Sequence, residues 1–441
     1  MIICLFDQTP SLSEQAFEKG EVFTPWSRLP FVKFSIVDSL MLILLCGSLA
    51  KIIQQFQSSE FRRSKIVRAH FFFLLVWGIG SIVGLIRFGP VTTVFFQGFG
   101  ILHGLIIFFL SVAIIQRVED VRLIIHTIII CAAAKSFQGL YFWLFDIGRP
   151  GPEGAAIVFY DLSSCDLMIL ILLFAFYSWS VLEKPYKVLL IVSVLPAIVA
   201  FIFSYRRNLY LGVIIATAVT LLYRMKGFLN LLRRQWFRFV ALVFVIGGCG
   251  YLVIPADSVD FVWGRFASSF EIVDQETKQT DASNAFRIIE AINVLDNFVQ
   301  NPVFGAGFGG RYAISFSPEG MDLSFIEDVN NVVHNSYLGI LYKVGLIGFA
   351  TFVIAYGIIY RALLSRTLSE YGIVQVTFFL LIVVLVSNFF SPNVFFERAM
   401  SLPALLFGLC QAAISISTDR ERAAPLNMFL DCADNRLHEH P

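Results

Sequence analysis

The chain has few charged side chains for its length. Only 15% of its 441 residues are Asp, Glu, Lys or Arg, whereas about 25% is usual in a soluble globular protein. The 33 Lys and Arg nearly balance the 32 Asp and Glu, so the net charge is only +1. So little charge excludes a soluble protein of this size, and the near-neutral balance gives no sign of a nucleic acid partner.

The chain also lacks the cysteine and histidine patterns of a disulfide framework or a structural zinc site. Its cysteines are scattered, mostly inside apolar stretches, without a Cys-x-x-Cys pair: Cys4, Cys46, Cys131, Cys165, Cys249, Cys410 and Cys432. The carboxylates of its longest polar segment, Asp322, Glu327 and Asp328, do not have the spacing of a metal-binding loop. We therefore expect no metal and no cofactor.

Hydrophobic residues, in contrast, make up 57% of the chain. They occur in repeated runs of about 20 residues, which is the length that crosses the hydrocarbon core of a bilayer as a helix. This pattern predicts an all-α polytopic membrane protein with about eleven transmembrane helices. The expected spans are 31–53, 69–87, 94–116, 121–145, 156–180, 186–204, 208–224, 236–255, 335–360, 371–390 and 395–416.

Lys and Arg in the connections predict the orientation, because they concentrate on the inner side of a membrane. Connections such as 54–68 and 224–238 are rich in them, whereas the alternate connections hold few. This asymmetry places the N-terminus outside. The predicted parts are an outer segment 1–30, transmembrane helices 1–8 in 31–255, a large outer loop 256–334, transmembrane helices 9–11 in 335–416 and an inner tail 417–441.

The outer loop contains an amphipathic helix over residues 285–300. Apolar residues recur there at helical spacing, and Arg287 and Glu290 lie at more polar positions. The positive end of the helix would help Arg287 to bind an anion. An ordinary ion pair between Arg287 and Glu290 is the alternative interpretation.

His334 is the histidine that the predicted topology places at the outer surface, just before the span 335–360. A neutral imidazole can take a proton from an attacking hydroxyl, because its ordinary pKa lies near neutrality. The alternative is a histidine that only bonds to backbone at the start of a helix.

Arg206 and Arg207 form an adjacent pair in a short outer connection, against the general trend of the chain. Guanidinium groups are permanently charged and bind phosphate oxygens in a fork geometry. The pair therefore predicts a clamp for a diphosphate, with lipid headgroup contact or an interfacial anchor as the alternatives. The glycine-rich run 305–310 follows no expected strand and lacks the ending of a phosphate-binding loop, so we expect a turn there.

Three segments together resemble the signature of the O-antigen ligase/polymerase superfamily. They are Asn284-Ala-Phe-Arg-Ile-Ile-Glu290, Asn301-Pro-Val-Phe-Gly-Ala-Gly-Phe-Gly309, and His334-Asn-Ser-Tyr-Leu followed by Gly345 and Gly348. The resemblance covers residues 195–360 in order. Members of that family are inverting, metal-independent glycosyltransferases that use a polyprenyl-diphosphate-linked saccharide at the periplasmic face of the bacterial inner membrane.

The resemblance implies roles for individual residues. Arg207, or its neighbour Arg206, and Arg287 would hold the donor diphosphate, and His334 would activate the acceptor hydroxyl. Glu290 and Asn335 are candidate supporting residues. The implied partners are the lipid-linked donor, a glycan or lipid A-core acceptor, and membrane lipids.

The signature does not separate a ligase, which joins a glycan to lipid A-core, from a polymerase, which extends a lipid-linked repeat. We favour the ligase, and a protein O-oligosaccharyltransferase is a less favoured third choice. A transporter or flippase is the alternative from another class, because Lys135 and Asp166 lie deep inside expected spans. The outer cations favour surface chemistry instead.

Overall fold

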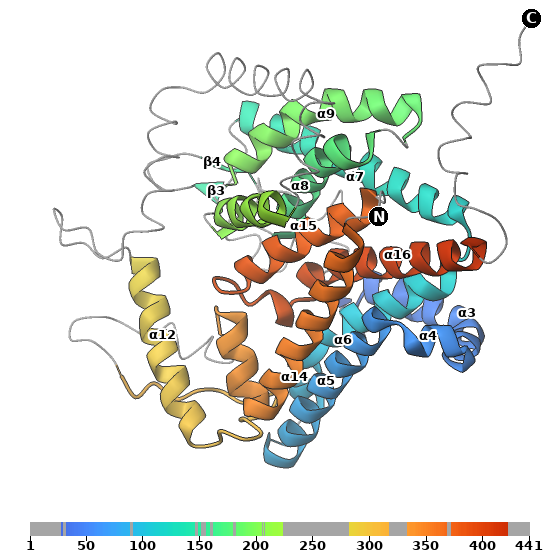
Figure 1. The fold of residues 1–441 in the computed structure, drawn as a ribbon. Coiled ribbons are helices and arrows are strands. Elements are labelled where there is room, and N and C mark those ends of the chain that lie inside the picture. Colours follow the sequence, from blue (N-terminus) through green and yellow to red (C-terminus); the bar gives the residue numbers. More distant parts are fainter. Residues whose placement is uncertain are drawn as a thin grey trace, which may run out of the picture.

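The computed structural model describes much of the chain, and its described part is predominantly helical (Figure 1). The described residues are 28–29, 32–88, 91–145, 149–150, 156–158, 162–179, 182–204, 206, 208–223, 282–316, 333–367 and 372–421. Long helices are the expected solution for apolar runs in lipid, because a helix satisfies its own backbone hydrogen bonds. Two short antiparallel strand pairs, β1–β2 and β3–β4, accompany them.

The elements of the first half follow one another closely. They are β1 Arg28–Leu29, β2 Val32–Ser35, α3 Ile36–Gln57, α4 Ser59–Arg63, α5 Lys65–Phe88, α6 Val91–Ile114, α7 Val118–Leu144, β3 Arg149–Pro150, β4 Ala156–Ile157, α8 Leu162–Tyr177 and α9 Lys184–Ile202. A further helix, Asn208–Tyr223, follows α9. The second half contains α12 Ala282–Val299, α14 Ser336–Thr367, α15 Gly372–Ser387, the 3-10 helix η3 Asn393–Phe395 and α16 Glu397–Glu421.

Seven helices of the described part are long and apolar enough to cross a membrane, namely α3, α5, α6, α7, α9, α14 and α16. Three shorter apolar helices join them: α8, Asn208–Tyr223 and α15. The protein is therefore a polytopic membrane protein, as the sequence predicts. Ten of the eleven expected spans coincide with these helices, and the eighth, 236–255, lies outside the described residues.

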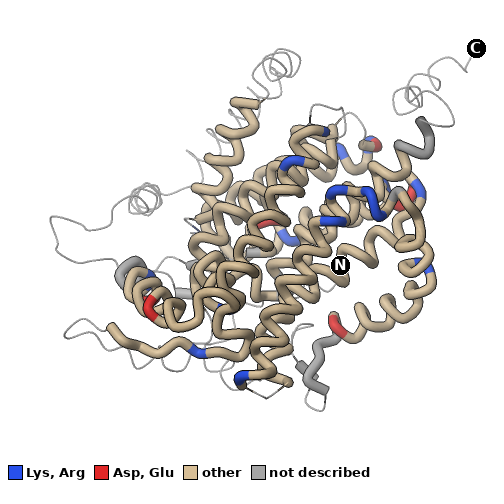
Figure 2. Tube along the Cα trace, turned by 60° about the horizontal axis from the view of Figure 1, so that its bottom comes forward, with Lys and Arg blue, Asp and Glu red and all other residues tan. Residues whose placement is uncertain are grey.

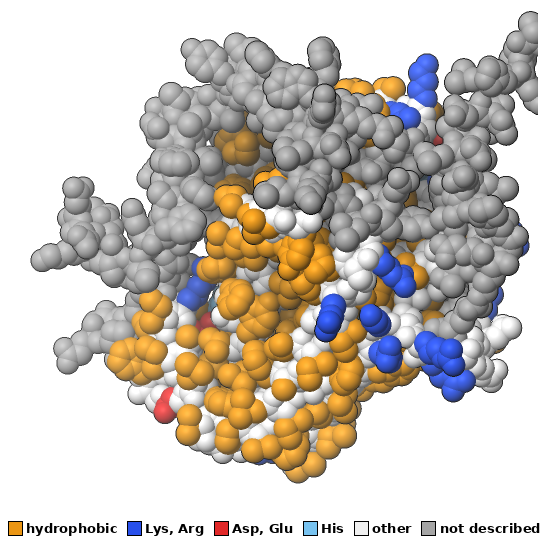
Figure 3. Space-filling view, viewed as in Figure 1, with side chains coloured by type: hydrophobic (Ala, Val, Ile, Leu, Met, Phe, Trp, Pro, Cys, Tyr) orange, Lys and Arg blue, Asp and Glu red, His pale blue; other side chains and the backbone are white. Residues whose placement is uncertain are grey.

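The distribution of charged residues agrees with membrane-spanning helices. Figure 2 shows most Lys and Arg near helix ends, with few charges between them. Figure 3 shows apolar side chains over much of the face that α5, α12 and α14 present. Lys135 on α7 and Asp166 on α8 are both buried, and these two helices pack against each other.

Helix α14 is broken at Gly345, where φ is 66° and ψ is −171°. Only glycine adopts such a conformation without strain. The part after Gly345 is by itself long enough to cross a bilayer. The part before it, beginning at Ser336, packs beside α12 at one side of the bundle (Figure 1). The expected span 335–360 is thus two helical pieces in succession.

The break in α14 is filled by the glycine-rich segment that follows α12. Ala306 N and Gly307 N donate to the carbonyls of Tyr342 and Lys343 at 2.8 Å each, and Leu346 N donates to the Pro302 carbonyl at 2.8 Å. Backbone groups on both sides of the break are thus hydrogen-bonded to this segment. Irregular backbone at such a place is tolerated because protein surrounds it.

Phe308 anchors this segment between the spans. Its side chain is fully buried, and its backbone N–H donates to the Gly80 carbonyl on α5 at 2.8 Å. A Cβ added at Gly80 or at Gly98 on α6 would lie 2.6 or 2.8 Å from the Phe308 ring, so both positions need glycine to make room. The segment is a turn, as expected, and it is packed into the membrane domain.

Candidate active site

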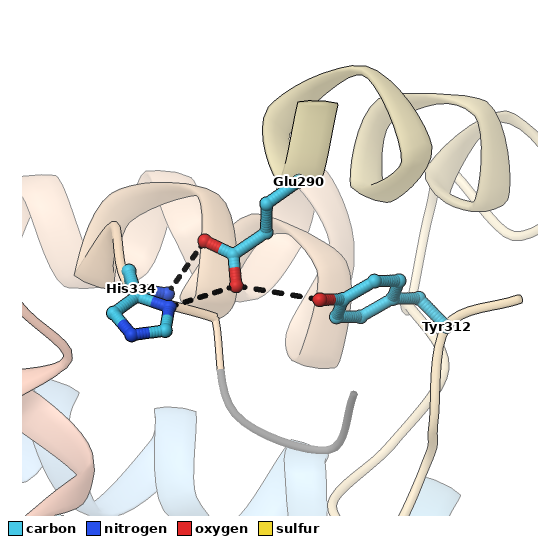
Figure 4. Close-up of polar contacts among 3 residues, drawn as sticks. All are labelled: Glu290, Tyr312 and His334. Carbon is cyan, nitrogen blue, oxygen red and sulfur yellow. Dashed lines mark hydrogen bonds and ion pairs between the residues drawn. The ribbon is translucent and has the colours of Figure 1, made fainter. Parts of the chain in front are cut away.

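The site is centred on a contact between α12 and the residues that lead into α14. Glu290, on the buried face of α12, accepts a hydrogen bond on Oε2 from the His334 backbone N–H at 2.9 Å. Its Oε1 lies 3.0 Å from His334 Nδ1. One carboxylate thus fixes both the backbone and the ring of His334 (Figure 4).

This contact determines how the imidazole can act. An ionised carboxylate only accepts hydrogen bonds, so His334 Nδ1 is the donor to Glu290, and in a neutral imidazole held this way the lone pair lies on Nε2. Nε2 points away from Glu290 (Figure 4) and has no hydrogen-bond partner among the described residues. The Glu290 side chain is 3% exposed and that of His334 is 40% exposed. A buried carboxylate therefore orients a histidine whose side chain is partly exposed.

Tyr312 supports the carboxylate from the other side. Its hydroxyl donates to Glu290 Oε1 at 3.3 Å, and its side chain is 1% exposed. Burial, together with the neighbouring Glu290 carboxylate, raises the pKa of Tyr312 well above its ordinary value. The phenol therefore stays protonated and remains a donor to Glu290.

Two asparagines of α12 hold Tyr312 and the residues after it in place. Asn293, which is fully buried, accepts from Ser315 N and Phe316 N at 2.8 and 2.7 Å and donates to the Phe316 carbonyl at 2.9 Å. Asn297 exchanges two hydrogen bonds with the Ala313 backbone. The returning chain is thus paired with α12 although it forms no strand.

Asn335 has a structural role in this arrangement. Its Oδ1 accepts from Tyr337 N at 2.9 Å and from Leu338 N at 3.1 Å, which is the geometry of an N-cap. The cap begins α14 directly after His334, so the histidine sits at a defined helix start. Asn335 therefore supports the site by fixing the backbone next to His334.

The three predicted arginines differ in what the structure describes. Arg287 is partly buried on α12, three residues before Glu290. The carbonyl of Arg206 accepts from Leu209 N and Tyr210 N at 2.9 and 3.2 Å, so Arg206 is fixed to the start of the helix Asn208–Tyr223. Arg207 lies outside the described residues.

The glycine-rich run is not available as a phosphate-binding loop. Its backbone N–H groups already have protein acceptors, including Gln97 Oε1, which takes the Gly309 N–H at 2.6 Å. Arg87 donates to the Gly305 carbonyl at 2.9 Å, and Lys343 donates to the Gly310 carbonyl. The run anchors the segment between α12 and α14 to the spans. Among the described residues no cluster of three or more metal-ligating side chains occurs.

Sequence reasoning named His334, Arg287 and Glu290 but missed Tyr312. Tyr312 follows the glycine run and belongs to no recognisable motif, and its partner Glu290 is distant in sequence. The sequence gives no signal for this role of Tyr312. It becomes apparent only from the pairing of residues 313–316 with Asn293 and Asn297 in the structure.

Fold and site together define a multi-pass membrane protein that holds a carboxylate-oriented histidine at the entry of a helix. Residues 156–353 match the model of the O-antigen ligase family. The match includes α8, α9, α12 and the first part of α14, and it confirms the resemblance drawn from the motifs. Members of this family are membrane enzymes of glycan transfer. Comparison with curated proteins gives no match.

Proposed function

We propose that this protein is an inverting glycosyltransferase of bacterial surface polysaccharide assembly. It transfers a glycan from a polyprenyl diphosphate donor to a hydroxyl of an acceptor on the periplasmic face of the inner membrane. The observation that carries the proposal is the Glu290-oriented His334, whose side chain is 40% exposed. Its Nε2 would accept the proton.

The reaction follows from the placement of these groups. His334 Nε2 takes the proton of the acceptor hydroxyl as its oxygen bonds to the anomeric carbon of the donor. The bond between that carbon and the diphosphate oxygen breaks, and the polyprenyl diphosphate leaves. Arg287, with Arg206 or Arg207, stabilises the charge that develops on the leaving group.

The remaining parts of the proposal concern topology and acceptor. The segment 256–334 forms the periplasmic loop, residues 31–255 and 335–416 supply the spans, and the ends 1–30 and 417–441 lie outside and inside. Apolar faces of the spans accommodate the polyprenyl tail. We favour ligation to lipid A-core, and a repeat-unit polymerase is the second candidate because it would use the same residues.

Complementation of a deletion strain tests the proposal. The strain receives the wild-type gene, His334→Ala, Arg287→Ala or Arg207→Ala, and its surface glycan is examined by gel electrophoresis. Asp296→Ala, at an exposed position of α12, is the matched control and should rescue fully. We expect none of the three site variants to rescue.

Full rescue by all three would overturn the proposal. Comparison of the deletion strain with the wild-type strain also separates the ligase from the polymerase. If deletion removes every glycan from lipid A-core, the enzyme is a ligase. If deletion leaves a single repeat on lipid A-core, it is a polymerase.

A further inference from the structure

The connection between α15 and α16, residues 388–396, contacts both halves of the proposed site. Asn208 Nδ2 donates to Ser391 Oγ at 3.2 Å, and Ser336 Oγ donates to the Ser391 carbonyl at 2.6 Å. Asn208 directly follows the arginine pair, and Ser336 is two residues after His334. Ser391 is therefore the one residue joined to both in the described part of the chain.

The 388–396 connection is itself held firmly. Asn393 Nδ2 donates to Ser387 Oγ and to Asn388 Oδ1, both at 3.1 Å. Phe395 packs so closely that a Cβ at Gly100 on α6 would lie 2.5 Å from its carbonyl carbon. A Cβ at Gly339 on α14 would lie 2.6 Å from its ring. A connection fixed in this way can transmit position between the elements that it contacts.

The link between the 388–396 connection and His334 is short. Besides the bond to Ser391, the Ser336 N–H donates to the Asn388 carbonyl at 2.8 Å. Ser336 is fully buried and lies in the first turn of α14, which Asn335 caps. A shift of the connection would therefore shift the start of α14, and His334 with it.

The link between the 388–396 connection and Arg206 is also short. Asn208 is the first residue of the helix Asn208–Tyr223, and the Arg206 carbonyl accepts two N–H groups of its first turn. Ser391 Oγ, the acceptor for Asn208, is the only side-chain atom that the link needs from the connection. The link can thus be removed by a single small substitution.

We propose that Ser391 is a positioning residue that fixes the spacing between Arg206 and His334. This inference rests on the glycosyltransferase function proposed above. Attack on the anomeric carbon requires the leaving diphosphate and the incoming hydroxyl to be held in register. A misplacement of about 1 Å in such a site can lower the rate by about 10²-fold. Ser391 does not touch the reacting atoms.

The test uses the full-length protein, purified and placed in liposomes. The probes are the polyprenyl-diphosphate-linked glycan and the glycan-free lipid A-core, both extracted from the deletion strain. Steady-state rates are measured for Ser391→Ala, Ser391→Thr, Asn208→Ala and the double variant Ser391→Ala/Asn208→Ala. Thr217→Ala, an exposed position of the same helix whose Oγ1 bonds only to its own helix, is the matched control.

We expect Ser391→Ala and Asn208→Ala each to lower kcat, on the order of 10-fold per folded molecule, with little change in the donor KM. The double variant should be no slower than either single variant, because one hydrogen bond is lost in all three. Ser391→Thr keeps the Oγ acceptor and should restore kcat. Thr217→Ala should match wild type.

Three results would overturn this inference. They are a wild-type kcat for Ser391→Ala, multiplied effects in the double variant, or a loss explained wholly by less folded protein at unchanged kcat. His334→Ala, assayed in parallel, separates the two proposals. An active His334→Ala variant sinks the proposed function, whereas an inactive one beside a normal Ser391→Ala variant sinks only the role of Ser391.

Discussion

Two histidines of this protein each lie beside one carboxylate, one at the candidate site and one among the spans. His334 Nδ1 is 3.0 Å from Glu290, and the His334 side chain is 40% exposed. His103 Nε2, on α6, is 3.8 Å from Asp38 Oδ1 on α3, and its side chain is fully buried. His103 Nδ1 lies 3.2 Å from Ser401 Oγ on α16.

The two histidines differ in what lies beside the second nitrogen of each imidazole ring. Both ring nitrogens of His103 have a protein neighbour, so this histidine joins three helices. His334 has its carboxylate on one nitrogen only, and its other nitrogen points away from that carboxylate (Figure 4). A histidine–carboxylate pair is therefore not sufficient for proton transfer from a substrate, because access to the second nitrogen is also needed.

The largest expected effect separates the two histidines. His334→Ala should lower transfer by about 10²- to 10⁴-fold, the usual contribution of a general base. His103→Asn should leave the transfer rate per folded molecule close to wild type. Rates are measured on purified protein in liposomes. Equal losses from both variants would remove the distinction drawn here.

The second effect concerns Phe308, which anchors the glycine-rich segment between the spans. Phe308→Ala should destabilise the protein by about 3–5 kcal/mol, because a fully buried aromatic ring between spans is lost. Phe304→Ala, in the same segment but 51% exposed, is the matched control. Thermal unfolding in detergent measures both. Similar unfolding temperatures for the two variants would show that the segment is not anchored by Phe308.

The third effect concerns the two carboxylates beside these histidines, Glu290 and Asp38. Glu290→Gln keeps the size of the side chain, but its amide N–H₂ would face His334 Nδ1 and favour the tautomer whose Nε2 is already protonated. Transfer should fall by on the order of 10²-fold. Asp38→Asn is the counterpart beside His103 and should change the transfer rate little. A fully active Glu290→Gln variant would mean that the tautomer of His334 does not matter.

The smallest effect is expected at Tyr312. Tyr312→Phe removes one hydrogen bond to Glu290 and should cost about 0.5–1.5 kcal/mol of stability, with a modest loss of transfer. Because the pKa of Tyr312 is raised in the folded protein, this contribution is fully present below pH of about 10 and declines only at higher pH. Unfolding measured against pH checks this, with Tyr141→Phe at an exposed position as control. A difference that already declines near neutral pH would contradict it.

Much of the membrane domain could be predicted from the sequence, because the length of an apolar run directly reports a span. The runs around α5, α6 and α7 illustrate this. The break at Gly345 could not be predicted in the same way. It depends on the segment 302–307, which supplies the hydrogen bonds that the helix gives up. Local periodicity carries no information about that pairing.

The site was predictable to the extent that motifs mark it. His334 and Arg287 stand in recognisable segments, and Glu290 follows Arg287 at helical spacing. Tyr312 and Ser391 stand in no recognisable segment, because what distinguishes them is contact with residues far away in the chain. Sequence patterns thus indicate the candidate site residues His334 and Arg287 better than the side chains that pack around them.

The most direct test of the account is whether Glu290 acts through His334. Transfer rates are measured for Glu290→Gln, His334→Ala and the double variant Glu290→Gln/His334→Ala, per folded molecule and at saturating donor. If the carboxylate serves to orient the imidazole, the double variant is no slower than His334→Ala alone. If the two losses multiply, Glu290 has an independent role and the central claim is contradicted.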